Sequence, residues 1–104
     1  MLANQDLNNL RFKIDAVDDE IIRLFQERMH ISSEIAEFKK EHQLPVQDVQ
    51  REREKISDLI LKSEEDFKSY TSVLYSLLFE LSRSYQDKIL YPSSDLKDKI
   101  SSAI

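Results

Sequence analysis

The chain has 104 residues, enough for one domain, and its composition excludes several classes of protein. It contains no glycine and only two prolines, which disfavours a fold built on tight hairpin turns. It also contains no cysteine, so disulfides and thiolate chemistry are excluded. A net charge of −5 argues against a basic surface for nucleic acid, and no apolar run approaches membrane-spanning length. Because the N-terminal stretch is too polar for a signal peptide, we expect a cytoplasmic protein.

The first predicted element is one long helix, from about residue 6 to about residue 42, because no helix breaker occurs before Pro45. Such a helix spans roughly 50 Å, more than a compact domain of this size needs. Its apolar residues are alternately three and four positions apart, as in the seam of a coiled coil, except for one step of seven between Leu24 and Ile31. They are Leu7, Leu10, Ile14, Val17, Ile21, Leu24, Ile31, Ile35 and Phe38.

Two shorter helices are expected after a connector at residues 44–46. Asp48 can cap the second helix, which should end near Lys62. After a loop, a third helix is predicted from about residue 67 to about residue 90. Its apolar stripe consists of Phe67, Tyr70, Val73, Leu74, Leu77, Leu78 and Leu81.

These elements predict an all-α fold of three helices, the first far longer than the others. We expect one domain at residues 1–91 and a tail at residues 92–104 that is disordered or forms a short helix. One chain cannot bury the long seam alone, so the economical arrangement is an intertwined homodimer. A single long coiled coil is the competing arrangement, and the breaks at Pro45 and Ser63 argue against it.

Arg28 is an anomaly, because it occupies a seam position where a hydrophobic residue is expected. A guanidinium buried there needs an anion, either a ligand or an ion-pair partner that sets the register. Alternatively, the arginine lies at the edge of the seam and extends its charged end into water. Lys39 follows after almost three turns on the same face, roughly 16 Å along the axis, and the two could bracket a small dianion. Equally, Lys39 suits a solvated helix end. Arg11 lies roughly 25 Å before Arg28, so the two could bind one small ligand only if Arg11 came from the other chain of a dimer. Considered alone, Arg11 is expected to be a surface residue.

The remaining polar candidates have ordinary alternatives. Asp48, Arg51 and Glu52 open the second helix, where a capping aspartate and a charged exposed face explain most such runs. Ser82 and Gln86 lie one turn apart. Instead of belonging to a site, they could mark the point where the third helix leaves the core. The sequence shows no nucleophile–base pair, phosphate loop or complete set of metal ligands.

Together these residues resemble the all-helical class of chorismate mutases. The stretch LNNLRFKIDAVDDEIIRLFQERMHISSEIAEFKK looks like that family's first helix, with its L-x-x-L-R-x-x-I-D-x-x-D-x-x-I opening, E-R-M segment and closing lysine. PVQDVQRERE looks like the family's P-V-x-D-x-x-R-E segment, and Ser82 and Gln86 match its S-x-x-x-Q. The match covers residues 7 to about 90, and the order and spacing of the pieces make it specific.

The resemblance implies a rearrangement of chorismate to prephenate, in phenylalanine and tyrosine biosynthesis, without cofactor or metal. The enzyme would stand alone or form the mutase domain of a bifunctional shikimate-pathway enzyme. Arg28, and Arg11 from the other subunit, would hold the two substrate carboxylates. Lys39 and Gln86 would donate hydrogen bonds to the ether oxygen whose bond to carbon breaks.

The same resemblance assigns supporting roles. Glu52 and the backbone at Asp48 would hold the ring hydroxyl, Ser82 would assist at a carboxylate, and Arg51 would support the site. An isochorismate-pyruvate lyase on the same fold is the nearest alternative, although the intact Asp48-x-x-Arg51-Glu52 segment favours the mutase. A non-catalytic helical dimerisation or regulatory domain is the alternative from another class.

Overall fold

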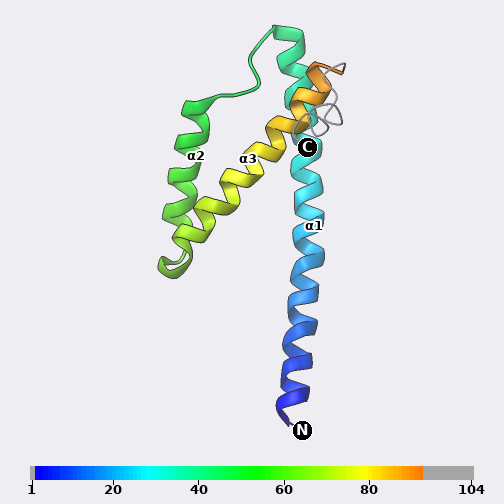
Figure 1. Cartoon of the computed structure of the whole chain (residues 1–104), viewed down its shortest axis with the longest axis vertical. Coiled ribbons are helices and arrows are strands. Elements are labelled where there is room, and N and C mark those ends of the chain that lie inside the picture. Colours follow the sequence, from blue (N-terminus) through cyan, green and yellow to red (C-terminus); the bar gives the residue numbers. More distant parts are fainter. Residues whose placement is uncertain (1, 93–104) are drawn as a thin grey trace, which may run out of the picture. The chain divides into compact units, whose positions relative to one another are not determined.

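A computed structural model describes residues 2–92 of the chain. The element order is α1 (Leu2–His42), α2 (Val49–Lys62), a short 3-10 helix η1 (Glu65–Phe67) and α3 (Lys68–Leu90) (Figure 1). No strand occurs within this range, which confirms the predicted all-α fold of three helices. No helix in this range is long and apolar enough to cross a membrane. Of the predicted tail, only Pro92 falls among the described residues.

The helix ends follow local sequence signals. α1 begins at Leu2 rather than near Asp6, because the first residues include good helix formers and no breaker. The carboxylate of Asp48 caps α2, as predicted, by accepting a hydrogen bond from the backbone nitrogen of Arg51 at 3.0 Å. α2 ends at Lys62, also as predicted.

The C-terminus of α1 turns through a residue in the left-handed region. Gln43 has a φ of 54°, and the backbone nitrogen of Leu44 donates to the carbonyl of Lys39 at 2.9 Å. This is the hydrogen bond of a Schellman cap, in which glycine is usually the left-handed residue. The chain contains no glycine, so a glutamine adopts this conformation and directs the connector away from α1.

Two compact units divide the chain within α1, at residues 1–31 and 32–104. In the first unit every described side chain up to residue 24 is exposed. Its seam residues leave about half of their surface uncovered: Leu7, Leu10, Ile14, Val17, Ile21, Leu24 and Ile31. A row of exposed large apolar side chains of this length marks an interaction surface rather than an ordinary protein exterior.

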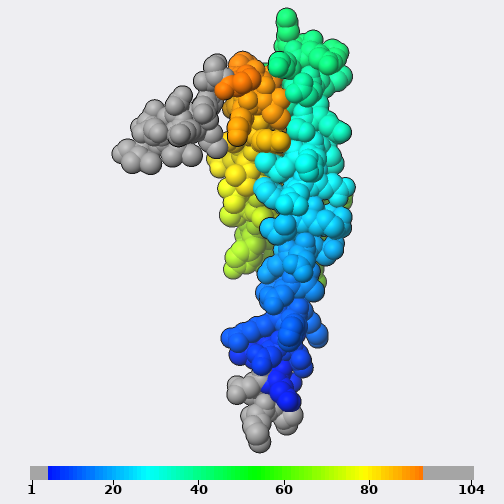
Figure 2. All heavy atoms as spheres, turned by 90° about the vertical axis from the view of Figure 1, so that its right-hand side faces the viewer, coloured from blue at the N-terminus to red at the C-terminus, as the bar shows by residue number. Residues whose placement is uncertain are grey.

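In the second unit, α2 and α3 pack as a helical hairpin joined by η1 (Figure 1). The hydroxyl of Ser63, at the end of α2, donates to the hydroxyl of Thr71 in α3 at 2.8 Å. Figure 2 shows the last turns of α1, in teal, against the end of α3, in orange, and hydrogen bonds between side chains join the two segments. The residues buried in this unit are few and mostly polar: Ser32, Ala36, Phe79, Ser82 and Gln86.

The buried face of α3 differs from the predicted apolar stripe. Every residue of that stripe except Leu78 is exposed: Phe67, Tyr70, Val73, Leu74, Leu77 and Leu81. The face that is covered instead runs through Phe79, Ser82 and Gln86, which are spaced three and four apart. The covered face of α3 therefore combines one aromatic residue with two hydrogen-bonding side chains, in place of the predicted apolar stripe.

Candidate active site

Lys39 lies at the centre of a polar cluster in the second unit. Its ammonium nitrogen donates to the backbone carbonyl of Val46 at 2.6 Å and to Oε1 of Gln86 at 2.9 Å. Burial lowers the pKa of Lys39, while the carboxylates of Asp48 and Glu52 act in the opposite direction. A lysine held in this way is a fixed donor with one further hydrogen to offer, because an ammonium group has three.

Gln86 is buried and uses both ends of its amide. Since Lys39 can only donate, the carbonyl oxygen of Gln86 faces it, and the amide nitrogen of Gln86 then donates to Oγ of Ser82 at 3.1 Å. The hydroxyl of Ser82 in turn lies 2.5 Å from that of Ser32. Lys39, Gln86, Ser82 and Ser32 thus form one continuous chain of hydrogen bonds between α1 and α3, which fixes the orientation of each donor.

The three predicted residues at the start of α2 differ in their surroundings. Asp48 and Arg51 are exposed, and the carboxylate of Asp48 is occupied with capping the helix. Glu52 is three-quarters buried and forms an ion pair with Arg83 of α3. Of the three, Glu52 is therefore the one whose carboxylate a neighbouring helix holds in place.

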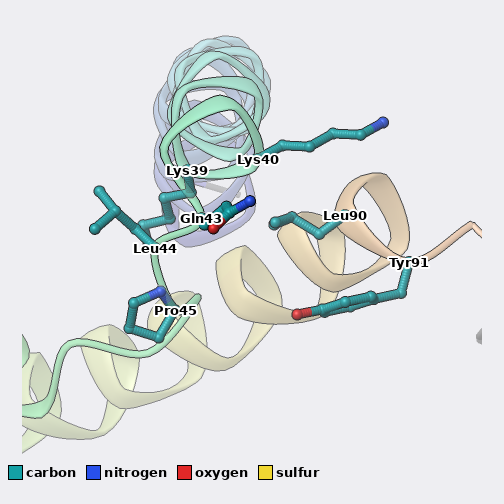
Figure 3. Close-up of a pocket in the computed structure, with 7 residues that line it drawn as sticks. All are labelled: Lys39, Lys40, Gln43, Leu44, Pro45, Leu90 and Tyr91. Atoms are coloured by element: carbon teal, nitrogen blue, oxygen red, sulfur yellow. The ribbon is translucent and has the colours of Figure 1, made fainter.

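A hollow of about 430 Å³ lies beside Lys39 and is open to solvent. Figure 3 shows the residues that line it: Lys39, Lys40 and Gln43 from the end of α1, Leu44 and Pro45 from the connector, and Leu90 and Tyr91 from the end of α3. Lys40 is exposed, whereas Lys39 is half-buried. Two neighbouring lysines therefore differ in environment, which makes Lys40 a suitable control for experiments on Lys39.

The two predicted arginines belong to the first unit. Arg28 is half-buried, whereas Arg11 is exposed beside a shallow hollow of about 320 Å³ that it shares with Asn8, Phe12 and Asp15. The structure thus brings Lys39, Ser82 and Gln86 together within the second unit. Arg11 and Arg28 lie in the first unit, and their predicted roles stay predictions.

Comparison with known proteins identifies the family. The sequence model described as "Chorismate mutase type II" matches residues 10–87 of the chain, most of its length. The chain belongs to the type II chorismate mutase family. This confirms the resemblance found in the sequence.

Similarity to individual proteins supports this family assignment. The chain is 34% identical to the "Bifunctional chorismate mutase/prephenate dehydratase" of Buchnera aphidicola subsp. Acyrthosiphon pisum, over 86% of this chain and 24% of that protein. It is 35% identical to the protein of the same description from Enterobacter agglomerans, again over 86% of this chain and 24% of that protein. It is also 35% identical to the "Chorismate mutase" of Methanocaldococcus jannaschii, over 47% of this chain and 50% of that protein. The chain spans about a quarter of the length of these bifunctional relatives, and no solved structure matches it significantly.

Two contacting residues of this type II chorismate mutase domain were not among the sequence candidates. Ser32 is buried against Ser82, and Arg83 pairs with Glu52. Ser32 had a usable signal, because it lies two turns before Lys39 and therefore on the same face of α1. Arg83 had none, since an arginine beside a polar helix end is unremarkable in a single sequence.

Proposed function

We propose that this chain rearranges chorismate to prephenate. The observation that carries the proposal is the partly buried chain of hydrogen bonds from Lys39 through Gln86 to Ser82, in a protein of the type II chorismate mutase family. The reaction is intramolecular: an ether C–O bond breaks while a C–C bond forms, and no group is transferred. The protein therefore needs to supply a shaped site and fixed donors, not a base or a nucleophile.

Charge development at the ether oxygen explains the use of Lys39 and Gln86. As the C–O bond breaks, negative charge grows on this oxygen, which can only accept hydrogen bonds. Lys39 has one ammonium hydrogen beyond the two that hold it in place, and the amide nitrogen of Gln86 has one beyond that given to Ser82. Because these donors are already oriented, they stabilise the transition state without reorganising.

The other proposed contacts fix the substrate's conformation. Arg28, with Ser82 assisting, and Arg11 from a second copy of the chain would bind the two carboxylates. Glu52 and the backbone at Asp48 would hold the ring hydroxyl. Holding the enolpyruvyl arm over the ring in this way removes conformational freedom before the reaction, which lowers its barrier.

A homodimer is part of the proposal. The seam of the first unit leaves apolar residues such as Leu10, Ile14 and Val17 more than half exposed, and a second copy of the same helix is the simplest partner with a matching pattern. Arg51 is kept as a supporting residue of the site, and the cytoplasmic location expected from the sequence stays a prediction.

The decisive experiment is an assay of the purified chain with chorismate and, separately, with isochorismate. We expect prephenate from chorismate, and a loss on the order of a hundredfold or more in the Lys39→Ala variant, as for removal of one donor from a developing oxyanion. Lys40→Ala is the matched control, because it removes an exposed lysine from the same turn, and it should retain activity. Pyruvate release from isochorismate alone would favour the lyase. A well-folded chain inactive on both substrates would favour the non-catalytic alternative.

A further inference from the structure

The ion pair between Glu52 and Arg83 differs from an ordinary surface pair. Nη1 of Arg83 in α3 donates to Oε1 of Glu52 in α2, and the two side chains are only 25% and 23% exposed. The pair between Arg23 and Glu20, by contrast, joins neighbours on one helix whose side chains are about 60% exposed. A partly buried pair between two helices is screened less by water and fixes its partners more firmly.

Arg83 lies beside the proposed catalytic donors. It directly follows Ser82 and precedes Gln86 by three residues, so all three lie within little more than one turn of α3. Glu52, its partner, is also close enough to Lys39 to raise that lysine's pKa against the effect of burial. Two cations therefore act on one carboxylate, one from α1 and one from α3.

The observed hydrogen bonds show which partner each of these charged side chains has. Lys39 donates to Val46 and Gln86, whereas the carboxylate of Glu52 is held by Arg83. If Glu52 turned to Lys39 instead, it would occupy the ammonium hydrogen that the ether oxygen needs. With Arg83 on Oε1, the second carboxylate oxygen of Glu52 is left to accept a hydrogen bond from the ring hydroxyl.

We propose that Arg83 is a positioning residue of the site, which holds the Glu52 carboxylate against α3 and so leaves the ammonium group of Lys39 available to the substrate. This inference rests on the proposed function, because it assigns Lys39 to the ether oxygen and Glu52 to the ring hydroxyl. Arg83 itself touches neither substrate nor reacting atoms. Arg83 acts indirectly, by determining whether the carboxylate of Glu52 pairs with Arg83 or with Lys39.

The kinetic test compares Arg83→Met, Arg83→Lys and the double variant Arg83→Met/Glu52→Gln, each checked for helicity by circular dichroism. In Arg83→Met, Glu52 is free to pair with Lys39, so kcat should fall about tenfold, as expected when residues within one network are uncoupled. Arg83→Lys restores a cation and should recover most of kcat. The double variant should also recover most of it, because a neutral glutamine attracts the ammonium group of Lys39 far less than a carboxylate does. Its KM should be raised, because glutamine holds the ring hydroxyl less firmly than glutamate.

A merely structural role for Arg83 gives a different pattern. The double variant would then be as slow as Arg83→Met or slower, since a second contact between α2 and α3 is lost, and this result would overturn the proposal. An unchanged kcat in a folded Arg83→Met variant would overturn it as well.

A second measurement does not depend on turnover. The pKa of Lys39, followed by NMR titration of its side chain, should rise in Arg83→Met because Glu52 then pairs with it, and should not rise in the double variant. A Lys39 pKa that is the same in Arg83→Met as in the parent would refute the role of Arg83. If the parent fails to convert chorismate while this pKa behaves as expected, the proposed function fails and the control of Glu52 by Arg83 stands.

Discussion

At the scale of single residues, the candidate site depends on the ammonium group of Lys39, whose charged form is disfavoured by burial. Lys39 keeps two polar partners, Val46 and Gln86, that compensate part of its lost hydration. Burial nevertheless lowers the pKa of Lys39, with Asp48 and Glu52 opposing the shift. The same residue therefore reduces the stability of the fold and supplies the donor that the proposed reaction needs. Residues with shifted pKa values are common at functional sites for this reason.

This conflict predicts opposite effects of alkaline pH on activity and stability. Turnover should fall as Lys39 loses its proton, at a lower pH than for an ordinary lysine. Between the lowered folded pKa and the unfolded value of about 10.4, the unfolded chain binds more protons at this position, so the free energy of unfolding should rise with pH relative to a Lys39→Met variant. Denaturant unfolding of both proteins, from neutral pH into this range, measures the difference. A constant difference between the two would show that Lys39 does not titrate anomalously.

At the scale of elements, the connector between α1 and α2 begins from a conformation unfavourable for its residue. Gln43 is in the left-handed region, where a residue with a Cβ atom costs about 1–2 kcal/mol. The cap it forms positions Leu44 and Pro45, which line the hollow beside Lys39. The geometry of the connector, and of the Val46 carbonyl that holds Lys39, thus depends on a strained turn.

A glycine at this position should stabilise the fold. We expect Gln43→Gly to raise the free energy of unfolding by about 0.5–1 kcal/mol, the relief of strain being partly offset by the larger entropy of glycine in the unfolded chain. Gln47→Gly is the matched control in the same connector, at a residue without positive φ. It should not raise the free energy of unfolding. Thermal unfolding of both variants decides the matter: an equal or lower midpoint for Gln43→Gly than for the parent would contradict the prediction.

At the scale of the whole molecule, the apolar face of α1 has to be reconciled with a chain that buries so little. The described part of the chain buries only two hydrophobic residues, Ala36 and Phe79, whereas the seam residues are largely exposed. A helix of this kind gains stability only when another apolar face covers it. The proposed homodimer meets this need and also explains how Arg11 could act in a site of the other copy.

Mixed dimers test this arrangement directly. Homodimers of Arg11→Ala and of Arg28→Ala should each be poorly active, because both sites lack one arginine. Mixing the two variants should restore activity, since one of the two sites in each mixed dimer then contains both arginines. Sedimentation should show a dimer, and mass spectrometry of differently labelled chains should verify the exchange. Verified exchange without recovered activity would count against a trans role for Arg11, and a stable helical monomer would rule out the dimer.

The sequence by itself determined those features that depend on neighbouring residues. Asp48 caps α2, Pro45 lies in the break after α1, and Lys62 ends α2, because capping and helix breaking act over a single turn. The motifs around these positions were also sufficient to identify the family, which the comparison confirmed. The roles of the individual site residues, in contrast, stay predictions.

Only the tertiary structure decided which faces and which partners were used. Periodicity selected the leucine stripe of α3, but the covered face contains Phe79, Ser82 and Gln86, and the last two have partners in α1, far away in the sequence. Arg83 reaches Glu52 across 31 positions, and Ser82 reaches Ser32 across 50. Interactions between side chains so widely separated follow from how the helices pack. The spacing of residues within one helix can show that Ser32 and Lys39 share a face, but it does not show which residue of another helix either of them meets.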